Sequence, residues 1–365
     1  MKALLRSLIY VLPALLITLT ALAQSEEWTR KMLGFVGPVA KIYSVDLNKS
    51  TFTEQERATL SSAIQDLNNV SHGLKFSVIN FFSKKDPAIK AEYDQFKHSL
   101  DMAEKLMPLD PKQSVFYTRH AIGQCAACHS KGGKSTHLFD LFKDNKIPET
   151  EKGHLALAMR DYQASAEIFK TILLTSATPS DYFQTHRALV HYINSALLAD
   201  YDKDKILVDL KNIQDKATNK GTLNDLKNLR SNVSKPQEIK SVQEALTELQ
   251  SYQSDFMTFE KSLYTSLKIK NLLHEKLKDL KTNEERASAY AALGDIYAHF
   301  PEISIFMVPE NYYALCVRTH PKTELASECF KKYEDKIILG YSGSSGMHVP
   351  EFERARIKEL KKFTK

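Results

Sequence analysis

The feature that most constrains this chain is a single Cys-x-x-Cys-His string, formed by Cys125, Cys128 and His129. Two thiols at this spacing can add across the vinyl groups of a haem, and the imidazole that follows them can bind its iron. The string therefore predicts one covalent haem c. It is attached through Cys125 and Cys128, with His129 as the proximal metal ligand.

A bare Cys-x-x-Cys pair also occurs in zinc sites and in redox dithiols. A zinc site needs further ligands, but the remaining cysteines, Cys316 and Cys329, lie far along the chain and lack this spacing. A thioredoxin-like site needs a preceding strand, whereas the residues before Cys125 have a helical pattern. Haem attachment is therefore the interpretation that the residues favour.

The first 23 residues have the pattern of an export signal. Lys2 and Arg6 precede an uncharged apolar stretch, and Ala21-Leu22-Ala23 is a small-x-small cleavage site. A retained membrane anchor is the alternative, but the apolar stretch is short for a membrane-spanning helix and is interrupted by a proline. We expect cleavage, a periplasmic location in a bacterium, and no membrane span in the mature protein.

Removal of the signal would leave 342 residues, room for two or three domains, and would lower the formal net charge from +6 to +4. The small positive excess is spread over mixed Lys and Glu stretches, so it does not indicate nucleic-acid binding. We find no clear strand run and no hairpin signal, and Gly and Pro lie mostly between long amphipathic stretches. The sequence therefore predicts an all-α fold.

Residues 24–135 are expected to form a haem domain of four helices. The first spans about Glu26–Tyr43. The second begins after Thr53, an N-cap residue that has Glu56 three positions later, as in a capping box. The third spans Pro87–Leu106.

The fourth helix carries the haem motif. It starts near Pro111, a favoured first-turn residue, and Gly132-Gly133 is expected to end it directly after the motif. Its helical stripe contains Val115, Thr118, Ile122, Cys125 and His129. We therefore expect His129 on the buried seam of a helical bundle.

Four helices with the attachment motif at the end of the last one resemble the class II cytochromes c, the family of cytochrome c prime. The resemblance covers about Glu26–Gly133. In low-spin members a Met on the first helix is the second axial ligand, so the resemblance implies Met32 as the candidate sixth ligand. The chain departs from the family after the motif, where Ser130 and Lys131 replace an aromatic residue and an Arg.

That ending is closer to the class I cytochromes c, whose ligand Met lies downstream of the motif. The alternative ligand that this likeness implies is Met159, on an expected helix, although the Pro/Gly loop of such ligands is missing. A packing role for Met32 and a vacant sixth position are also open. The further candidates are Met102, Met107, His72, His120, His137 and His154.

The rest of the chain is expected to form helical pairs, in a first segment of residues 136–230 and a second of residues 231–365. Residues 153–173 predict either a tight helical hairpin or one long helix, and Leu210–Ile269 predicts solvated amphipathic helices. Arg160-Asp161-Tyr162 with Phe169 resembles the second helix of a tetratricopeptide repeat (TPR).

Further along, Tyr290-x-x-Leu293-Gly294-x-x-Tyr297 resembles the first helix of such a repeat. The two matches imply a TPR-like solenoid whose concave surface binds a protein partner. The alternative is an ordinary stack of α-hairpins with an Ala and aromatic seam.

Cys316 and Cys329 flank a turn at His320-Pro321. In an oxidising compartment such a remaining pair predicts a disulfide between two helices, about Asn311–Arg318 and Glu324–Asp335.

Together these features predict an exported mono-haem cytochrome that transfers single electrons and docks a redox partner protein through its helical-repeat domain. Two alternatives stay open: a haem-based gas or redox sensor with an open sixth position, and a periplasmic scaffold in which haem is mainly structural. We do not expect an enzyme, because a second Cys-x-x-Cys-His and a His-Glu-x-x-His zinc motif are both missing from the sequence.

Overall fold

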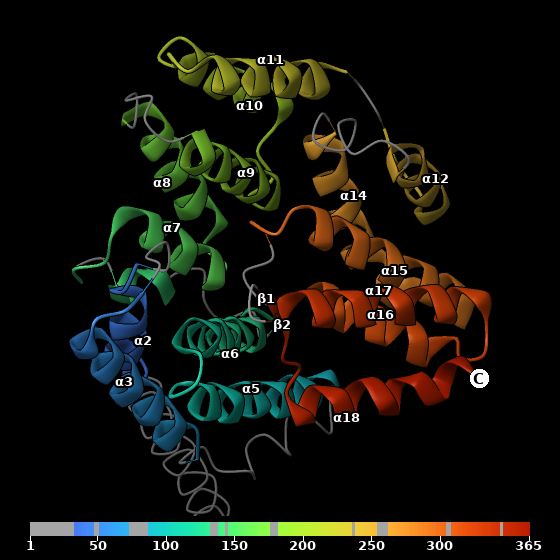
Figure 1. Cartoon of the computed structure of the whole chain (residues 1–365). Helices are drawn as coiled ribbons and strands as arrows, with labels where there is room; N and C mark the ends of the chain where they lie inside the picture. The colour runs from blue at the N-terminus through green and yellow to red at the C-terminus, as the bar shows by residue number, and fades with distance from the viewer. Residues whose placement is uncertain are drawn as a thin grey trace, which may run out of the picture. The chain divides into compact units, whose positions relative to one another are not determined.

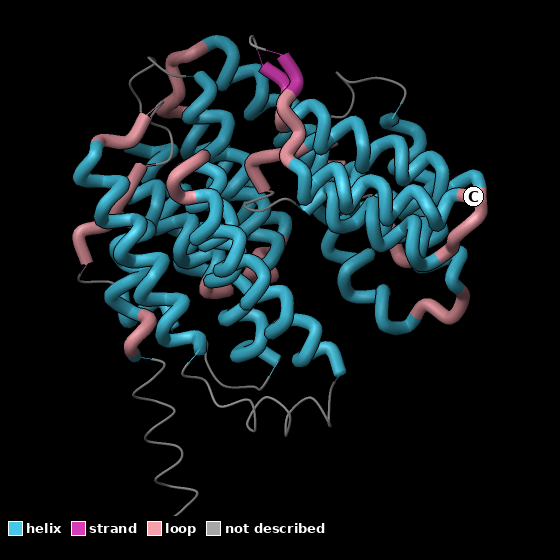
Figure 2. Tube along the Cα trace, turned by 60° about the horizontal axis from the view of Figure 1, so that its bottom comes forward, coloured by secondary structure: helices cyan, strands magenta, loops and turns pink. Residues whose placement is uncertain are grey.

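A computed structural model describes residues 33–46, 51–72, 87–131, 138–142, 145–175, 182–235, 238–253, 262–303, 308–343 and 346–365. Over these residues the fold is all-α, as predicted (Figure 2). The only strands among them are β1 (Ser342–Gly343) and β2 (Gly346–Met347), which pair antiparallel. No helix in these ranges combines the length and the apolar character needed to cross a membrane.

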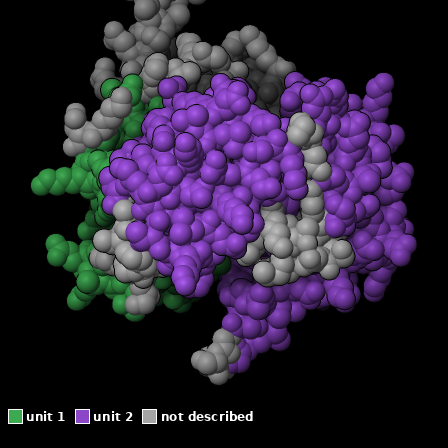
Figure 3. Space-filling model, turned by 90° about the horizontal axis from the view of Figure 1, so that it is seen from above, with its two compact units in different colours: residues 1–161 green, residues 162–365 purple. Residues whose placement is uncertain are grey.

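The chain divides into two compact units, which Figure 3 shows in different colours. Unit 1 ends at Asp161 and unit 2 begins at Tyr162. The described elements of unit 1 are α2 (Val36–Tyr43), α3 (Glu54–His72), α5 (Pro87–Leu106), α6 (Pro111–Lys131), the 3-10 helix η1 (Leu138–Phe142) and α7 (Glu149–Ala158).

In unit 1, α5 and α6 form a helical hairpin and lie side by side in Figure 1. The pair α2 and α3 packs against α6, and α2 also contacts η1 and α7. Large apolar side chains on three of these helices are fully buried: Ile42 and Tyr43 on α2, Leu60, Ile64 and Leu67 on α3, and Leu100 on α5. These side chains form the apolar interior on which α6 rests.

The sequence predicts the start of α3 and both ends of α5 correctly. The Thr53 N–H donates to Glu56 Oε2 (2.8 Å), and the Glu56 N–H donates to Thr53 Oγ1 (3.2 Å), which are the two bonds of a capping box. The range of α5, Pro87–Leu106, is the predicted one. Met32 and the residues before it, which belong to the first predicted helix, lie outside the described residues.

Between the two units the structure separates α7 from α8, where the sequence leaves open a hairpin or one long helix. α7 ends at Ala158, and Arg160 has a φ of 61°, in the left-handed region that an α-helix does not contain. α8 begins at Tyr162, the first residue of unit 2. The helical path is therefore interrupted at the boundary between the units.

Unit 2 is built from paired helices (Figure 1). Contacts join α8 with α9, α10 with α11, and α15 with α16. The described elements are α8 (Tyr162–Thr175), α9 (Tyr182–Leu198), α10 (Lys203–Gln214), α11 (Lys220–Ser234), α12 (Val242–Gln253), α14 (Leu263–Lys276), η2 (Leu277–Asp279), α15 (Asn283–His299), α16 (Val308–Thr319), α17 (Glu324–Gly340), α18 (Glu351–Leu360) and η3 (Lys361–Thr364).

α14 is buried on most of its surface, although its first half lies within Leu210–Ile269, where the sequence predicts solvated helices. Eight of its 14 residues are buried, including Leu267 and Leu273. The reason is tertiary, because α9, α11, α12 and α15 all contact this helix. Three polar positions, Thr265, Ser266 and Lys270, are therefore enclosed with the apolar ones.

α15 and α16 approach each other closely at Gly294. A Cβ added there would lie 2.5 Å from Cε1 of Tyr313 on α16. The Tyr313 hydroxyl donates to Asp295 Oδ1 (2.9 Å), and Lys332 Nζ of α17 donates to the same oxygen (2.7 Å). These bonds hold the ring in place, so the contact requires glycine.

Gly294→Ala is expected to destabilise unit 2 by about 1–2 kcal/mol. Crowding against Tyr313 should outweigh the roughly 1 kcal/mol that alanine gains over glycine inside a helix. Denaturant unfolding followed by circular dichroism measures the change. Gly340→Ala is the matched control, since nothing lies within 4 Å of a Cβ at Gly340. A Gly294→Ala protein as stable as the wild type would show that the Tyr313 ring moves away freely.

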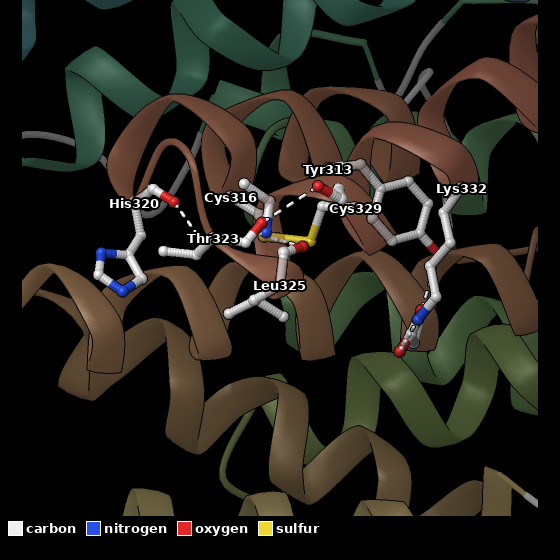
Figure 4. The surroundings of a disulfide bond; sticks show 10 residues. Tyr313, Cys316, His320, Thr323, Leu325, Cys329 and Lys332 are labelled. Atoms are coloured by element: carbon white, nitrogen blue, oxygen red, sulfur yellow. Dashed lines mark hydrogen bonds and ion pairs between the residues drawn. A yellow bond between two sulfur atoms is a disulfide. The ribbon is translucent and has the colours of Figure 1, made fainter. Parts of the chain in front are cut away.

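Cys316 and Cys329 form a disulfide that joins α16 to α17 (Figure 4). Their Cα atoms are 6.3 Å apart, and both residues are buried. Between them, Thr323 caps α17: its hydroxyl donates to the His320 carbonyl oxygen (2.8 Å) and accepts from the Ala326 N–H (3.2 Å). A covalent closure of a loop of this size stabilises a fold by about 3 kcal/mol, mainly by restricting the unfolded chain.

Candidate haem-attachment site

The Cys-x-x-Cys-His string lies in the last two turns of α6, which ends at Lys131. Positions three and four apart on a helix share one face, so the backbone places positions 125, 128 and 129 on one side of α6. The expected helix stop at Gly132-Gly133 lies outside the described residues. The side chains of Cys125, Cys128 and His129 lie outside the described part of the structure.

The same face of α6 is buried nearer the start of the helix. Val115 and Thr118 are fully buried, and Ile122 is 3% exposed. The Thr118 hydroxyl donates to the Ser114 carbonyl oxygen (2.8 Å), so its polar atom is satisfied within the helix. The predicted stripe is therefore confirmed at these three positions, and the face that carries the motif turns toward an apolar interior.

The hairpin of α5 and α6 places two of the candidate ligands far from the motif. The Ser114 hydroxyl donates to the Ala103 carbonyl oxygen (2.6 Å), which defines the register of the two antiparallel helices. Met102 is then level with Val115, roughly 20 Å along the helix axis from His129. Met107 follows α5 and lies farther still. Both methionines are buried at that end of unit 1, where they pack rather than face the motif.

His120 lies on the other side of α6. It precedes His129 by nine residues, and two and a half helical turns place it on the opposite face. Burial, with His98 of α5 nearby, lowers the pKa of His120 to about 4. Nε2 of Gln124 lies 2.9 Å from Nε2 of His120. His120 is therefore neutral at neutral pH and belongs to the buried packing on the face of α6 opposite position 129.

A buried ion pair joins α6 to α7. Arg119 Nη2 lies 2.8 Å from Glu151 Oε2, and the two side chains are 3% and 2% exposed. The guanidinium lies over the Tyr43 ring, 4.4 Å from its centroid, and Nη2 is 3.5 Å from the Val45 carbonyl oxygen. Arg119 thus connects the haem-motif helix to α7 and to the end of α2. No sequence pattern relates positions 119 and 151, so this ion pair could be identified only from the structure.

The remaining candidate ligands are placed only in part. Met159 is partly exposed and lies just beyond α7, whereas the sequence predicts it within a helix. Its N–H donates to the Leu155 carbonyl oxygen (2.8 Å). Nδ1 of His154 lies 3.4 Å from Glu151 Oε2. Met32, His137 and the side chain of His72 are outside the described residues. Met32 and Met159 as iron ligands therefore stay predictions.

The described residues place the motif at the end of a helix whose inner face is buried and which Arg119 fixes to α7. Compared with known proteins, the chain matches no protein-family model, no curated protein and no solved structure.

Proposed function

We propose that the chain is an exported mono-haem c-type cytochrome that transfers single electrons. The proposal is carried by one observation: Cys125, Cys128 and His129 occupy one side of the last two turns of α6, on the face that is buried at Val115 and Ile122. Haem c, when bound, supplies a one-electron couple at its iron. The resemblance to class II cytochromes c supports α2, α3, α5 and α6 as the helical bundle that holds it.

Each part of this site has a separate role. The thiols of Cys125 and Cys128 anchor the haem covalently, and the His129 imidazole holds its iron. The apolar side chains along the inner face of α6 keep water away, which tunes the potential of a buried redox centre. The ion pair of Arg119 and Glu151 keeps α6 fixed against α7.

The sixth iron position decides between two functions. A thioether from Met32, or from Met159 in the class I alternative, raises the reduction potential and closes the iron to gas ligands. A haem-based sensor with an open sixth position is the second candidate function. Met102 and Met107 lie at the far end of the α5–α6 hairpin, away from the motif. This placement favours the sensor, because two candidate ligands for the sixth position are too far from the iron.

Unit 2 is proposed to dock the protein redox partner. Its resemblance to a TPR at Tyr290–Tyr297 is supported by the close approach of α15 and α16, for which Gly294 is required. Stacked helical pairs of this type form extended concave surfaces that bind proteins. The export signal predicted for residues 1–23 supports a periplasmic location.

Covalent attachment is the first expected result. The full chain, expressed with a haem-maturation system and exported, should keep its haem-linked peroxidase stain through boiling and denaturing electrophoresis. The double substitution Cys125→Ala and Cys128→Ala should abolish the stain. Cys316→Ala with Cys329→Ala is the matched control and should retain it, since that pair forms the disulfide in unit 2. Loss of the stain on boiling the wild type would rule the proposal out.

Absorption spectra of the same preparations distinguish electron carrier from sensor. In the carrier the ferric haem should be low-spin, and the ferrous form should not bind carbon monoxide until Met32→Ala is introduced. A wild type that is high-spin and binds carbon monoxide at once would favour the sensor. A low-spin spectrum unchanged by Met32→Ala would assign the ligand to another residue.

A further inference from the structure

Unit 2 contains a lysine in its interior. Lys270 lies in the middle of α14 and is 4% exposed. Its Nζ donates to Oδ1 of Asn194 on α9, which is 3% exposed. Ser266, one helical turn before Lys270 on the same face of α14, is also fully buried. Three polar side chains are therefore enclosed between α9 and α14, whose other buried residues are mostly apolar.

Within the described part of the chain, Lys270 forms no ion pair. Among the described residues, two lysine or arginine side chains are less than a tenth exposed, Arg119 and Lys270. Arg119 is paired with the Glu151 carboxylate at 2.8 Å. Across the same residues no carboxylate forms an ion pair with Lys270, and its one hydrogen-bond partner is a neutral amide. Burial lowers its pKa to about 7, with no charged neighbour contributing to the shift.

In the described structure, the environment of the Lys270 ammonium lacks the negative charge that a buried cation normally has beside it. A buried ammonium is normally paired, because removing a charge from water is costly unless an opposite charge replaces the lost hydration. Nζ carries three N–H donors, and Asn194 Oδ1 uses one of them. The two that remain can form charge-assisted hydrogen bonds to an anion. The hydroxyl of Ser266 adds a polar group on the same side of the helix.

We propose that Lys270 and Asn194 form a binding site for one small monovalent anion, a halide ion or the carboxylate of a small acid, inside unit 2. A single negative charge is what neutralises the single ammonium. Both side chains are enclosed, so the proposed occupant is small. This inference does not depend on the haem proposal, since it concerns unit 2 alone.

The test uses thermal unfolding of the full chain at about pH 6, where the lysine is largely protonated. Sodium chloride, sodium formate and sodium gluconate are compared at equal ionic strength. We expect chloride, formate or both to raise the unfolding midpoint of unit 2 in a saturable way, by about 5 °C, while bulky gluconate does not. A rise with chloride alone identifies a halide site, and a rise with formate alone identifies a carboxylate site.

Two variants make the test specific. In Lys270→Met the difference between the salts should vanish. In Lys276→Met, on the same helix, it should remain, because Lys276 is 38% exposed and already pairs with Glu275 (2.7 Å). The proposal is overturned if gluconate stabilises as much as the small anions, or if Lys270→Met keeps the full response.

Discussion

Glu151→Gln is expected to destabilise unit 1 by about 3–5 kcal/mol, because it leaves the Arg119 guanidinium buried without its counter-charge. The two side chains are 3% and 2% exposed, so water does not replace the lost partner. A loss of this size is a large part of the 5–15 kcal/mol that typically stabilises a domain. Denaturant unfolding of the full chain, followed by circular dichroism, gives the change in the free energy of unfolding.

The same helix supplies the control. Glu149 also accepts an ion pair, from Lys152 Nζ at 2.6 Å, but the Glu149 side chain is 66% exposed. Glu149→Gln should therefore change the stability by less than about 0.5 kcal/mol. Replacing both charges, by Arg119→Met with Glu151→Leu, should recover most of the loss. If Glu151→Gln proved as stable as wild type, Arg119 would have to reach water or another acceptor.

Local signals were sufficient to predict the starts of α3, α5 and α6. The capping box at Thr53 and the prolines at Pro87 and Pro111 act within one helical turn, so they can be recognised in the sequence without knowledge of the fold. The apolar stripe of α6 is similarly a property of one helix. The Cys-x-x-Cys-His motif is the strongest signal, because the haem attachment proposed for it needs three residues that are close in sequence.

Features that depend on packing between helices were not predictable. Polar composition indicates exposure for α14, but α9, α11, α12 and α15 surround it. The ion pair of Arg119 and Glu151 joins residues 32 positions apart, and no periodic pattern in the sequence indicates it. A sixth ligand for the proposed haem iron is a question of the same kind, because it depends on which helix faces the motif.

Lys270→Met is expected to stabilise unit 2 at pH 7 by about 2–4 kcal/mol, in a buffer that contains no small anion. Burial lowers the pKa of Lys270 from 10.5 to about 7, which corresponds to a penalty on the order of 5 kcal/mol for the folded state. Methionine removes that penalty and keeps a long apolar side chain in the same place. Part of the gain is offset by about 1–3 kcal/mol, because Asn194 Oδ1 loses its donor.

The pH dependence of this gain distinguishes its cause from improved packing. As the pH falls from about 10.5 to about 7, the unfolded chain binds a proton at Lys270 that the folded chain does not bind, so the wild type loses stability across this window and loses no more below it. The difference between Lys270→Met and wild type should therefore grow as the pH falls from 10.5 and level off below pH 7. Lys276→Met should show no such window, since its side chain reaches solvent. A difference that stays constant from pH 6 to pH 10 would mean that Lys270 is solvated or neutralised in the folded chain.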